Sequence, residues 1–458
     1  MKNFSAGKLY ALAFGLFLGL CLWKFGNPVI LDQMVPPPVA PADFLNDPWP
    51  PHWAGWFLLP LAALGAALVF KNKLPLPPPR WLWLLPLAWL AWQFCAATQT
   101  VDARLTEPTF WHFAGCVACY FLGALVFARE KLWRWLLPGL LLALVFCLER
   151  AVTQHVYEFP QNRQALIEGE RTSWTNFTAE SLAQMKQENI IITTNGVEVA
   201  NPVILAKFTK NRVFGTLVYP NALAGVILLL LPVSLAVAFG STRKLKPLVR
   251  YAATGLLLFL GGAAFIWSGS KLGWLVGIGL IGVYLLRRDW SRKLKWTAVA
   301  TVLVLGLGIF AVRFQHYFAA GATSTGARLD YWRAAVQTTL ARPVFGTGPG
   351  TFQRPYAQLK APDSEMARLT HNDYLEQFSD SGVPGGLAYA AWIGLALLAA
   401  AKAQWRGGDA LAFAIFLGLL GWFAQGLGEF SLYVPALAWT AFTLLGSLVG
   451  NQAAPAKA

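Results

Sequence analysis

The feature that most constrains this chain is a series of twelve long apolar segments along its 458 residues. Their lengths are close to the roughly 20 residues that a helix needs to cross a bilayer. Because lipid offers the backbone no hydrogen-bond partner, such segments fold as helices inside a membrane. They lie at about 9–23, 55–70, 81–98, 109–128, 132–149, 214–240, 251–268, 272–286, 296–312, 384–401, 410–428 and 433–449. The sequence therefore predicts an all-α polytopic membrane protein with about 12 transmembrane helices.

Composition supports this class and excludes a soluble enzyme. Charged residues make up 13% of the chain, against about 25% in soluble domains. Many of the 21 tryptophans stand near the ends of apolar segments, where their rings settle at the level of the lipid headgroups. All five cysteines lie within predicted spans, and Cys116 and Cys119 lack a second ligand pair. We therefore expect neither a metal site nor a redox site at this pair.

The net charge of +15 would suggest a nucleic-acid partner in a soluble protein, but its distribution indicates membrane topology instead. Alternate connections carry 20 Lys and Arg against 3 acids, which leaves 17 bases and 19 acids for the other side. The positive-inside rule then predicts that both termini are cytoplasmic. The bases on that side are Lys2, Lys8, Lys71, Lys73, Arg80, Arg129, Lys131, Arg134, Arg243, Lys244, Lys246, Arg250, Arg287, Arg288, Arg292, Lys293, Lys295, Lys402, Arg406 and Lys457. No nucleic-acid partner is expected.

This topology divides the chain into five parts. The predicted parts are five helices over 1–149, an outward loop over 150–213, four helices over 214–312, a second outward loop over 313–383, and three helices with a short cytoplasmic tail over 384–458. The first segment also has features of a signal peptide, with Ala40-Pro41-Ala42 as a weak cleavage sequence. An uncleaved first span preserves the alternation of charge.

The two outward loops are the long connections, so the chemistry is expected there. In the first loop, a β-branched run from Ile190 to Thr194 ends at Asn195-Gly196, which predicts a helix followed by a hairpin. In the second loop, a helical stretch over 327–340 precedes a glycine cluster over 346–350. This cluster lacks the Gly-Lys-Ser/Thr of a phosphate-binding loop, and a tight turn is the favoured interpretation.

The densest polar cluster beside a predicted span begins at Thr370-His371-Asn372 and is followed by Gly382 and Gly385. His371 can both accept and release a proton near neutral pH, as a general base must. Taken alone, a histidine at a helix start can instead be a cap or a surface residue.

Three cations at span boundaries favour a functional role for His371 over a role as a cap or surface residue. Arg212 and Arg328 each offer a planar fork of donors that suits phosphate oxygens. Either arginine alone could instead anchor the chain at the interface. Lys271, between two closely spaced segments, is either another anchor or a third phosphate contact. Together with His371, the arginines predict a site for a diphosphate leaving group.

At these residues the chain resembles the O-antigen ligase and polymerase superfamily. The His-Asn pair at 371–372 with Gly382 and Gly385 is similar to that family's signature, and the segments 346–352 and 212–221 are similar in order and spacing. The resemblance implies a GT-C-type glycosyltransferase of the bacterial inner membrane. It also implies that a large periplasmic loop between helices 9 and 10 carries the catalytic residue.

The resemblance also implies roles for individual residues. His371 would activate an acceptor hydroxyl, and Arg212, Arg328 and Lys271 would bind the diphosphate of a polyprenyl-diphosphate-linked glycan donor. Attack would be direct and inverting, without nucleotide sugar, cofactor or metal, and the acceptor would be the lipid A core or another hydroxyl. The supporting residues would be Asn221, Asn372, Tyr374, Gly382 and Gly385. Family members often have Ser-Arg-Gly where this chain has Ser270-Lys271-Leu272, so a bidentate contact there becomes a point charge.

The sequence is compatible with several functions. A ligase, a polysaccharide polymerase and a protein O-oligosaccharyltransferase would use the same donor. A 12-helix secondary transporter is the non-enzyme alternative, but transporters place ionisable groups near the bilayer midplane. Here the polar clusters gather at one interface, which favours the enzyme.

Overall fold

The computed structural model describes residues 5–71, 80–241, 246–319, 321–362, 364–407 and 409–451. Over these ranges the regular secondary structure is helical except for one two-stranded sheet, as the sequence predicts. The helices are α1 (Ala6–Lys24), α2 (Pro41–Asn46), α3 (Pro51–Lys71), α4 (Leu84–Ala97), α5 (Ala103–Leu122), α6 (Leu137–Thr153), α7 (Phe159–Arg171), α8 (Ala179–Gln187), α9 (Pro202–Lys210), α10 (Pro220–Ser241), α11 (Pro247–Ser268), α12 (Lys271–Arg287), α13 (Arg292–Ala319), α14 (Thr323–Ala341), α15 (Gln353–Leu359), α16 (Asp373–Arg406), α17 (Ala410–Gln425) and α18 (Pro435–Asn451). The strands are β1 (Ile191–Thr194) and β2 (Val197–Ala200).

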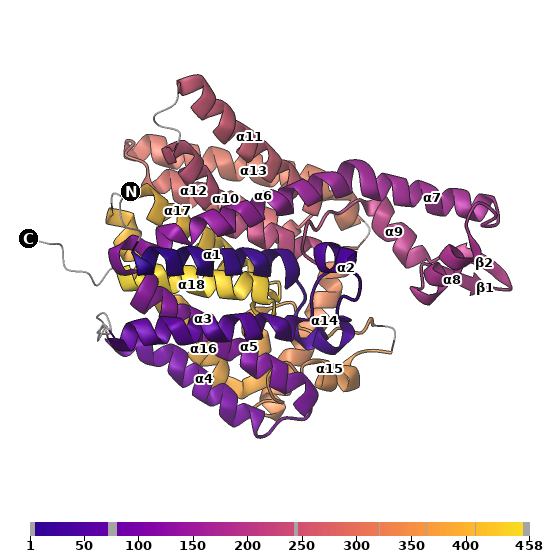
Figure 1. Cartoon of the computed structure of the whole chain (residues 1–458), viewed down its shortest axis with the longest axis horizontal. Coiled ribbons are helices and arrows are strands. Elements are labelled where there is room, and N and C mark those ends of the chain that lie inside the picture. The colour runs from indigo at the N-terminus through magenta and orange to yellow at the C-terminus, as the bar shows by residue number, and fades with distance from the viewer. Residues whose placement is uncertain are drawn as a thin grey trace, which may run out of the picture.

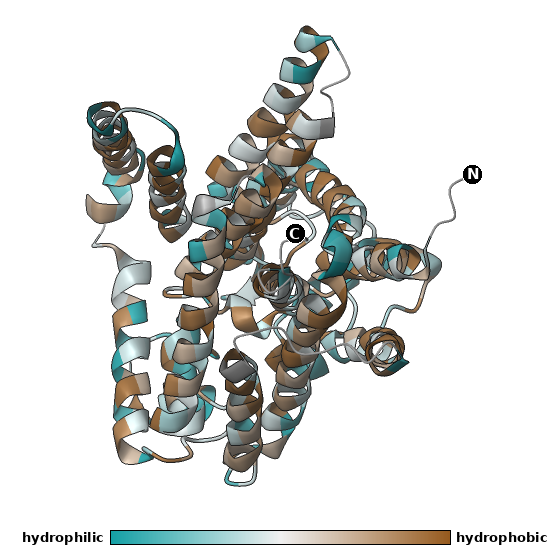
Figure 2. Ribbon diagram, turned by 90° about the vertical axis from the view of Figure 1, so that its left-hand side faces the viewer, coloured by the Kyte–Doolittle hydropathy of each residue, from teal (hydrophilic) through white to brown (hydrophobic). Residues whose placement is uncertain are grey.

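The helices confirm a polytopic membrane protein. In the described part of the chain, eight helical segments are long and apolar enough to cross a membrane, and α4 and α17 are shorter apolar helices. Hydrophobic residues run along most helices of the bundle (Figure 2). Each of the twelve predicted apolar segments overlaps a helix over most of its length, while the count of twelve crossings stays a prediction. Five of the bases used to predict topology, namely Lys2, Lys73, Arg243, Lys244 and Lys457, lie outside the described residues.

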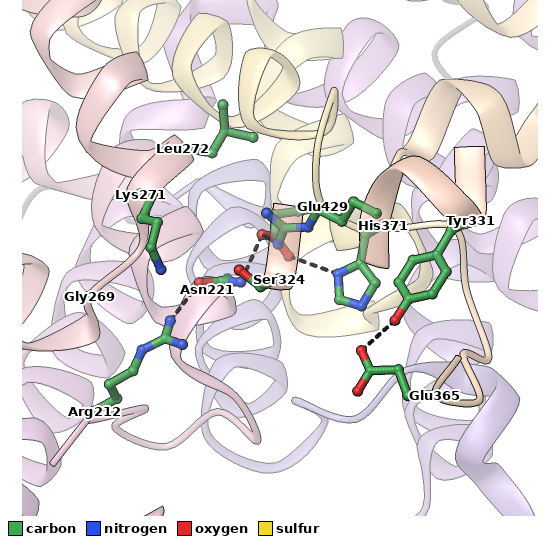
Figure 3. Close-up of a pocket in the computed structure, with 11 residues that line it drawn as sticks. Arg212, Asn221, Gly269, Lys271, Leu272, Ser324, Tyr331, Glu365, His371 and Glu429 are labelled. Atoms are coloured by element: carbon green, nitrogen blue, oxygen red, sulfur yellow. Dashed lines mark hydrogen bonds and ion pairs between the residues drawn. The ribbon is translucent and has the colours of Figure 1, made fainter. Parts of the chain in front are cut away.

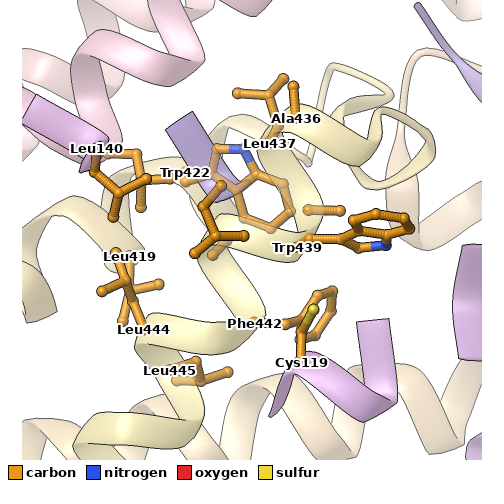
Figure 4. Packing of buried hydrophobic residues seen from close by; sticks show 14 of the residues in the cluster. Cys119, Leu140, Leu419, Trp422, Ala436, Leu437, Trp439, Phe442, Leu444 and Leu445 are labelled. Carbon is orange, nitrogen blue, oxygen red and sulfur yellow. The ribbon is translucent and has the colours of Figure 1, made fainter. Parts of the chain in front are cut away.

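Helix α18 lies at the centre of the bundle. Every residue from Pro435 to Gly450 is buried. The ring of Phe442 lies 6.4 Å from that of Trp422 in α17, measured between centroids, and Trp439 and several leucines belong to the same buried cluster (Figure 4). Gly446 allows close helix contact, because a Cβ there would lie 2.0 Å from a backbone oxygen of α5. All five cysteines are free.

The start of α1 and the end of α18 lie at the same end of the bundle (Figure 1). The two helices are antiparallel, since the Ala436 amide at the start of α18 donates to the Phe25 carbonyl that follows α1, at 3.3 Å. An even number of spans requires this arrangement. The opposite end of the bundle is the one from which α7 projects, and α14 lies there too.

The segment over 150–213 forms a small projecting unit. Helix α6 continues through a π-helical stretch, Gln154–Glu158, into α7, which extends beyond the bundle (Figure 1). Strands β1 and β2 pair antiparallel, with Ile191 opposite Ala200 and the turn at Asn195-Gly196. The predicted helix and hairpin are confirmed. Helix α9 then returns the chain to the bundle, just before Arg212.

Candidate active site

A cavity of about 190 Å³ is lined in part by Arg328 of α14, and α14 lies at the end of the bundle opposite the start of α1 (Figure 1). The cavity collects side chains from segments far apart in the sequence (Figure 3). Five of the predicted site residues line it, namely Arg212, Asn221, Lys271, Arg328 and His371. The structure adds Ser324, Tyr331, Glu365 and Glu429 to the polar lining.

Glu429 is the centre of the hydrogen-bond network in this cavity. Its side chain is 1% exposed, and its Oε1 accepts from Arg328 Nη2 at 2.5 Å and from Asn221 Nδ2 at 2.7 Å. Its Oε2 lies 3.5 Å from His371 Nδ1. A buried carboxylate needs such partners, because an unpaired charge in a low-dielectric interior is costly. Glu429 thus joins one predicted phosphate-binding arginine to the predicted base.

Arg212 is held by two hydrogen bonds, one of them to Asn221, which also bonds Glu429. Its Nε donates to the Ser268 carbonyl at 2.8 Å, and its Nη2 donates to Asn221 Oδ1 at 3.0 Å. Burial lowers the pKa of the guanidinium from its ordinary value, the Glu429 carboxylate opposes this, and the Arg328 charge adds to the lowering. Like charges held together in this way favour an anion between them.

Lys271 begins α12, where a cation is disfavoured by the helix dipole. The ammonium lies 3.8 Å from the centroid of the Tyr317 ring, and Ser270 caps the helix by accepting from the Gly273 amide at 3.3 Å. The amino group points into the cavity (Figure 3). Lysine and helix N-terminus together present positive potential, which is typical of an anion site.

The cavity therefore carries a net positive charge. Arg212, Lys271 and Arg328 face the carboxylates of Glu429 and Glu365, which gives three positive charges against two negative ones. Glu365 accepts from the Tyr331 hydroxyl at 2.5 Å. Burial raises the pKa of Tyr331, and the bond to Glu365 raises it further, so the phenol is a neutral donor.

His371 lies in a tightly held turn before α16. Its φ is +51°, a left-handed conformation that is uncommon outside glycine and stays only where the surroundings impose it. On one side, the amide and hydroxyl of Thr370 donate to Glu376 Oε2 at 2.6 and 2.8 Å. On the other side, Asn372 Nδ2 donates to the Leu427 carbonyl at 2.8 Å. The backbone is thus fixed on both sides of the imidazole.

Asn372, rather than His371, caps α16. The Asn372 Oδ1 accepts from the amides of Tyr374 and Leu375 at 3.1 and 3.0 Å, as N-cap residues do. The interpretation of His371 as a helix cap is therefore wrong. Its ring packs between Tyr331 and Phe430, with centroid distances of 5.9 and 4.7 Å, and its side chain is 30% exposed.

The glycine cluster and the kink of α16 form a support for this turn. Helix α16 breaks at Ser381 and Gly382, next to the predicted start of a span at 384. The Gly348 amide donates to the Asp380 carbonyl at 2.8 Å, and the Val383 amide donates to the Pro343 carbonyl at 2.8 Å. Gly382 has a φ of +68°, and a Cβ there would lie 2.3 Å from the Val344 oxygen. The predicted tight turn is confirmed, and it packs against the kink.

One of the five predicted supporting residues, Asn221, lines the cavity. The other four, Asn372, Tyr374, Gly382 and Gly385, lie outside its lining. The Tyr374 hydroxyl donates to the Phe423 carbonyl at 3.2 Å. A Cβ at Gly385 would lie 2.2 Å from the Ser381 hydroxyl oxygen. These residues hold α16 in place.

Four polar lining residues were not predicted from the sequence, namely Ser324, Tyr331, Glu365 and Glu429. Of these, Glu429 contacts three predicted site residues. It is the sole charged residue between 410 and 451. An isolated acid in such an apolar stretch is expected to be functional, so the signal was present. Its partners could not be deduced, because they lie 58 to 208 positions away in the chain.

The fold and the site define a polytopic membrane protein with a cationic cavity and a histidine–carboxylate pair, which suits anion binding combined with proton transfer. Residues 256–390 match a family model described as O-Antigen ligase. This match confirms the resemblance to the O-antigen ligase superfamily, which is associated with glycosyl transfer at membranes. The matched segment contains Lys271, Arg328 and His371, while Arg212 and Glu429 lie outside it. No curated protein matches the chain.

Proposed function

We propose that this protein is an O-antigen ligase-like glycosyltransferase. It transfers a glycan from a polyprenyl diphosphate to an acceptor hydroxyl, that of the lipid A core, at the periplasmic face of a bacterial inner membrane. The observation that carries the proposal is the position of the His371–Glu429 pair in one cavity with three cations from three segments.

The cations fit the leaving group. When the bond between the anomeric carbon and the diphosphate oxygen breaks, the diphosphate departs with the bonding electrons and gains negative charge. Arg212, Lys271 and Arg328 line the cavity that we assign to the diphosphate, and preorganised positive charge stabilises such a transition state. The three side chains supply the charge that a metal ion supplies in other transferases, so the proposed mechanism is metal-independent.

His371 fits the general base. Its Nδ1 faces Glu429, and a carboxylate on one ring nitrogen favours the proton there and leaves Nε2 basic. Nε2 then accepts the proton of the acceptor hydroxyl as its oxygen attacks the anomeric carbon. The imidazolium that forms is stabilised by the Glu429 carboxylate. A single displacement of this kind inverts the anomeric centre.

The arrangement of the chain supports the proposed topology. We propose twelve spans in a GT-C-type arrangement, with both termini cytoplasmic and the segments 150–213 and 313–383 periplasmic. The cavity lies at the end of the bundle opposite the start of α1 and the end of α18. Cytoplasmic termini therefore agree with a periplasmic site.

The test is a transfer assay with purified protein in lipid nanodiscs. The donor is a polyprenyl-diphosphate-linked glycan, offered with lipid A core, with an acceptor protein, or alone. His371→Ala is compared with His316→Ala, which changes an exposed histidine of α13 that is absent from the cavity lining. We expect glycosylated lipid core from the wild type and from His316→Ala, and none from His371→Ala.

Other products would redirect the assignment. Lengthening of donor-linked glycan without an acceptor would make the protein a polymerase, and glycan on the acceptor protein would make it an O-oligosaccharyltransferase. If no acceptor gave a product that depends on His371, the transferase proposal would fail.

A further inference from the structure

A second, larger groove adjoins the cavity, and Arg212 lines both. The groove has a volume of about 520 Å³, within the range of about 300–1,000 Å³ typical of small-molecule sites. One wall is α9, which contributes Val203, Ala206, Lys207 and Lys210, and the other wall includes Phe214 and Val218. The groove is thus lined by apolar side chains together with three cations, Lys207, Lys210 and Arg212.

The walls of the groove are held in place by the fold. Asn201 caps α9 by accepting from the Val203 amide at 3.0 Å. The Lys207 ammonium lies 5.0 Å from the centroid of the Phe214 ring on the opposite wall. At the C-terminal part of α9, Phe208 packs against Phe159, with a centroid distance of 5.6 Å. The groove is therefore largely preformed, as ligand sites usually are.

The connection through Arg212 identifies the occupant. In the donor, the diphosphate is bonded to the sugar on one side and to the lipid on the other. A residue that binds the diphosphate must therefore stand where a polar site meets an apolar one. Arg212 stands at such a junction, because the cavity on one side contains His371 and the groove on the other contains Val203, Phe214 and Val218.

We infer that this groove binds the isoprenoid units next to the diphosphate of the donor lipid, with Lys207 and Lys210 flanking the diphosphate. The inference rests on the proposed function and extends it, because it assigns α9 to donor recognition. The acceptor hydroxyl must instead reach His371, which lines the cavity and not the groove.

The first test compares two donors that carry the same glycan, one on a polyprenyl diphosphate and one on a methyl diphosphate. Ala206→Trp places an indole in the groove, and Thr209→Trp adds the same ring at an exposed position of α9 outside the groove lining. We expect Ala206→Trp to raise the KM of the polyprenyl donor by about tenfold, with the methyl donor's KM changed less than twofold. Thr209→Trp should leave both values unchanged. Equal effects of Ala206→Trp on the two donors, or no effect on the polyprenyl donor, would overturn the inference.

A second test does not require turnover. A prenyl diphosphate with a diazirine on its second isoprene unit and no sugar is photolysed with the wild-type protein, and the adducts are mapped by mass spectrometry. Adducts within 202–220 that unlabelled prenyl diphosphate displaces, and that Ala206→Trp removes, would support the groove. Adducts confined to other segments would refute it. If the groove is labelled but no acceptor receives glycan, the proposed function fails and the lipid site stands. If transfer proceeds while the adducts lie elsewhere, the reverse holds.

Discussion

Replacing Glu429 by glutamine tests the central contact of the site with little change in shape. The amide oxygen of glutamine can still accept from Arg328 and Asn221, which bond to one carboxylate oxygen in the native protein. The substitution therefore removes the negative charge beside His371 while preserving most of the hydrogen bonds. Its effect isolates the electrostatic contribution of Glu429 to proton transfer.

The magnitude follows from the distance between the two groups. A carboxylate and an imidazolium 3.5 Å apart attract by about 5 kcal/mol at an effective dielectric constant near 20. The pair to Arg328 shares the carboxylate charge, and the His371 side chain is 30% exposed, so water screens part of this attraction. About 2–3 kcal/mol should remain in the transition state, which corresponds to a loss of about 30- to 150-fold in kcat.

The assay is initial-rate glycan transfer in nanodiscs at saturating donor. The matched control is Glu365→Gln, which makes the same chemical change in a carboxylate that lines the same cavity but bonds Tyr331 instead of His371. We expect Glu365→Gln to keep kcat within about threefold of the wild type. Thermal unfolding in detergent, followed for both variants, separates loss of catalysis from loss of folded protein.

Two outcomes would refute the reasoning. Folded Glu429→Gln with a wild-type kcat would show that Glu429 does not stabilise a charged His371 during transfer. A similar large loss in both variants would show that the net charge of the cavity matters, rather than the contact between Glu429 and His371.

Two further substitutions test other parts of the site. Arg328→Lys keeps the charge but loses the planar fork, so we expect kcat/KM for the donor to fall about tenfold, whereas Arg333→Lys on the exposed side of α14 should change it less than twofold; equal values for the two variants would exclude a fork-specific contact. Gly382→Ala forces a Cβ into a backbone conformation that is nearly exclusive to glycine and to within 2.3 Å of a backbone oxygen, at a cost of at least about 2 kcal/mol. Its thermal midpoint should fall clearly below that of Gly394→Ala, where a Cβ on the same helix meets open space, and matching midpoints would contradict the packing argument.

Much of the fold was predictable from the sequence because its determinants are local. An apolar segment of bilayer length becomes a helix wherever it lies in the chain, so each of the twelve predicted segments overlaps a helix over most of its length. The hairpin at 191–200 follows from Asn195-Gly196 between two short β-branched runs, since that dipeptide accepts the positive φ values of the turn. The predicted start of a span at 384 lies two residues after the kink of α16 at Gly382. Glycine accepts the positive φ of that kink, as Asn-Gly does in the hairpin turn.

The sequence also indicated the type of chemistry through residues whose side chains permit few alternatives. His371, Arg212 and Arg328 were singled out by charge, hydrogen-bonding capacity and position at span boundaries, and all three line one cavity. Local pattern could not assign the neighbours of His371, however. Asn372 is a helix cap and Gly385 allows close packing, although both belong to the same motif.

Only the tertiary structure brought Glu429 to His371 and placed Arg212 between the cavity and the groove. These contacts depend on how α16, α17 and α18 pack, and on a turn in which the Asp373 amide donates to the Gly426 and Glu429 carbonyls at 2.8 and 3.1 Å. Spacing along the chain carries no record of such contacts, because they arise from the shapes of buried surfaces that meet across the bundle. The sequence by itself determined the membrane helices and the reactive groups, and the packing of those helices decided which groups share a site.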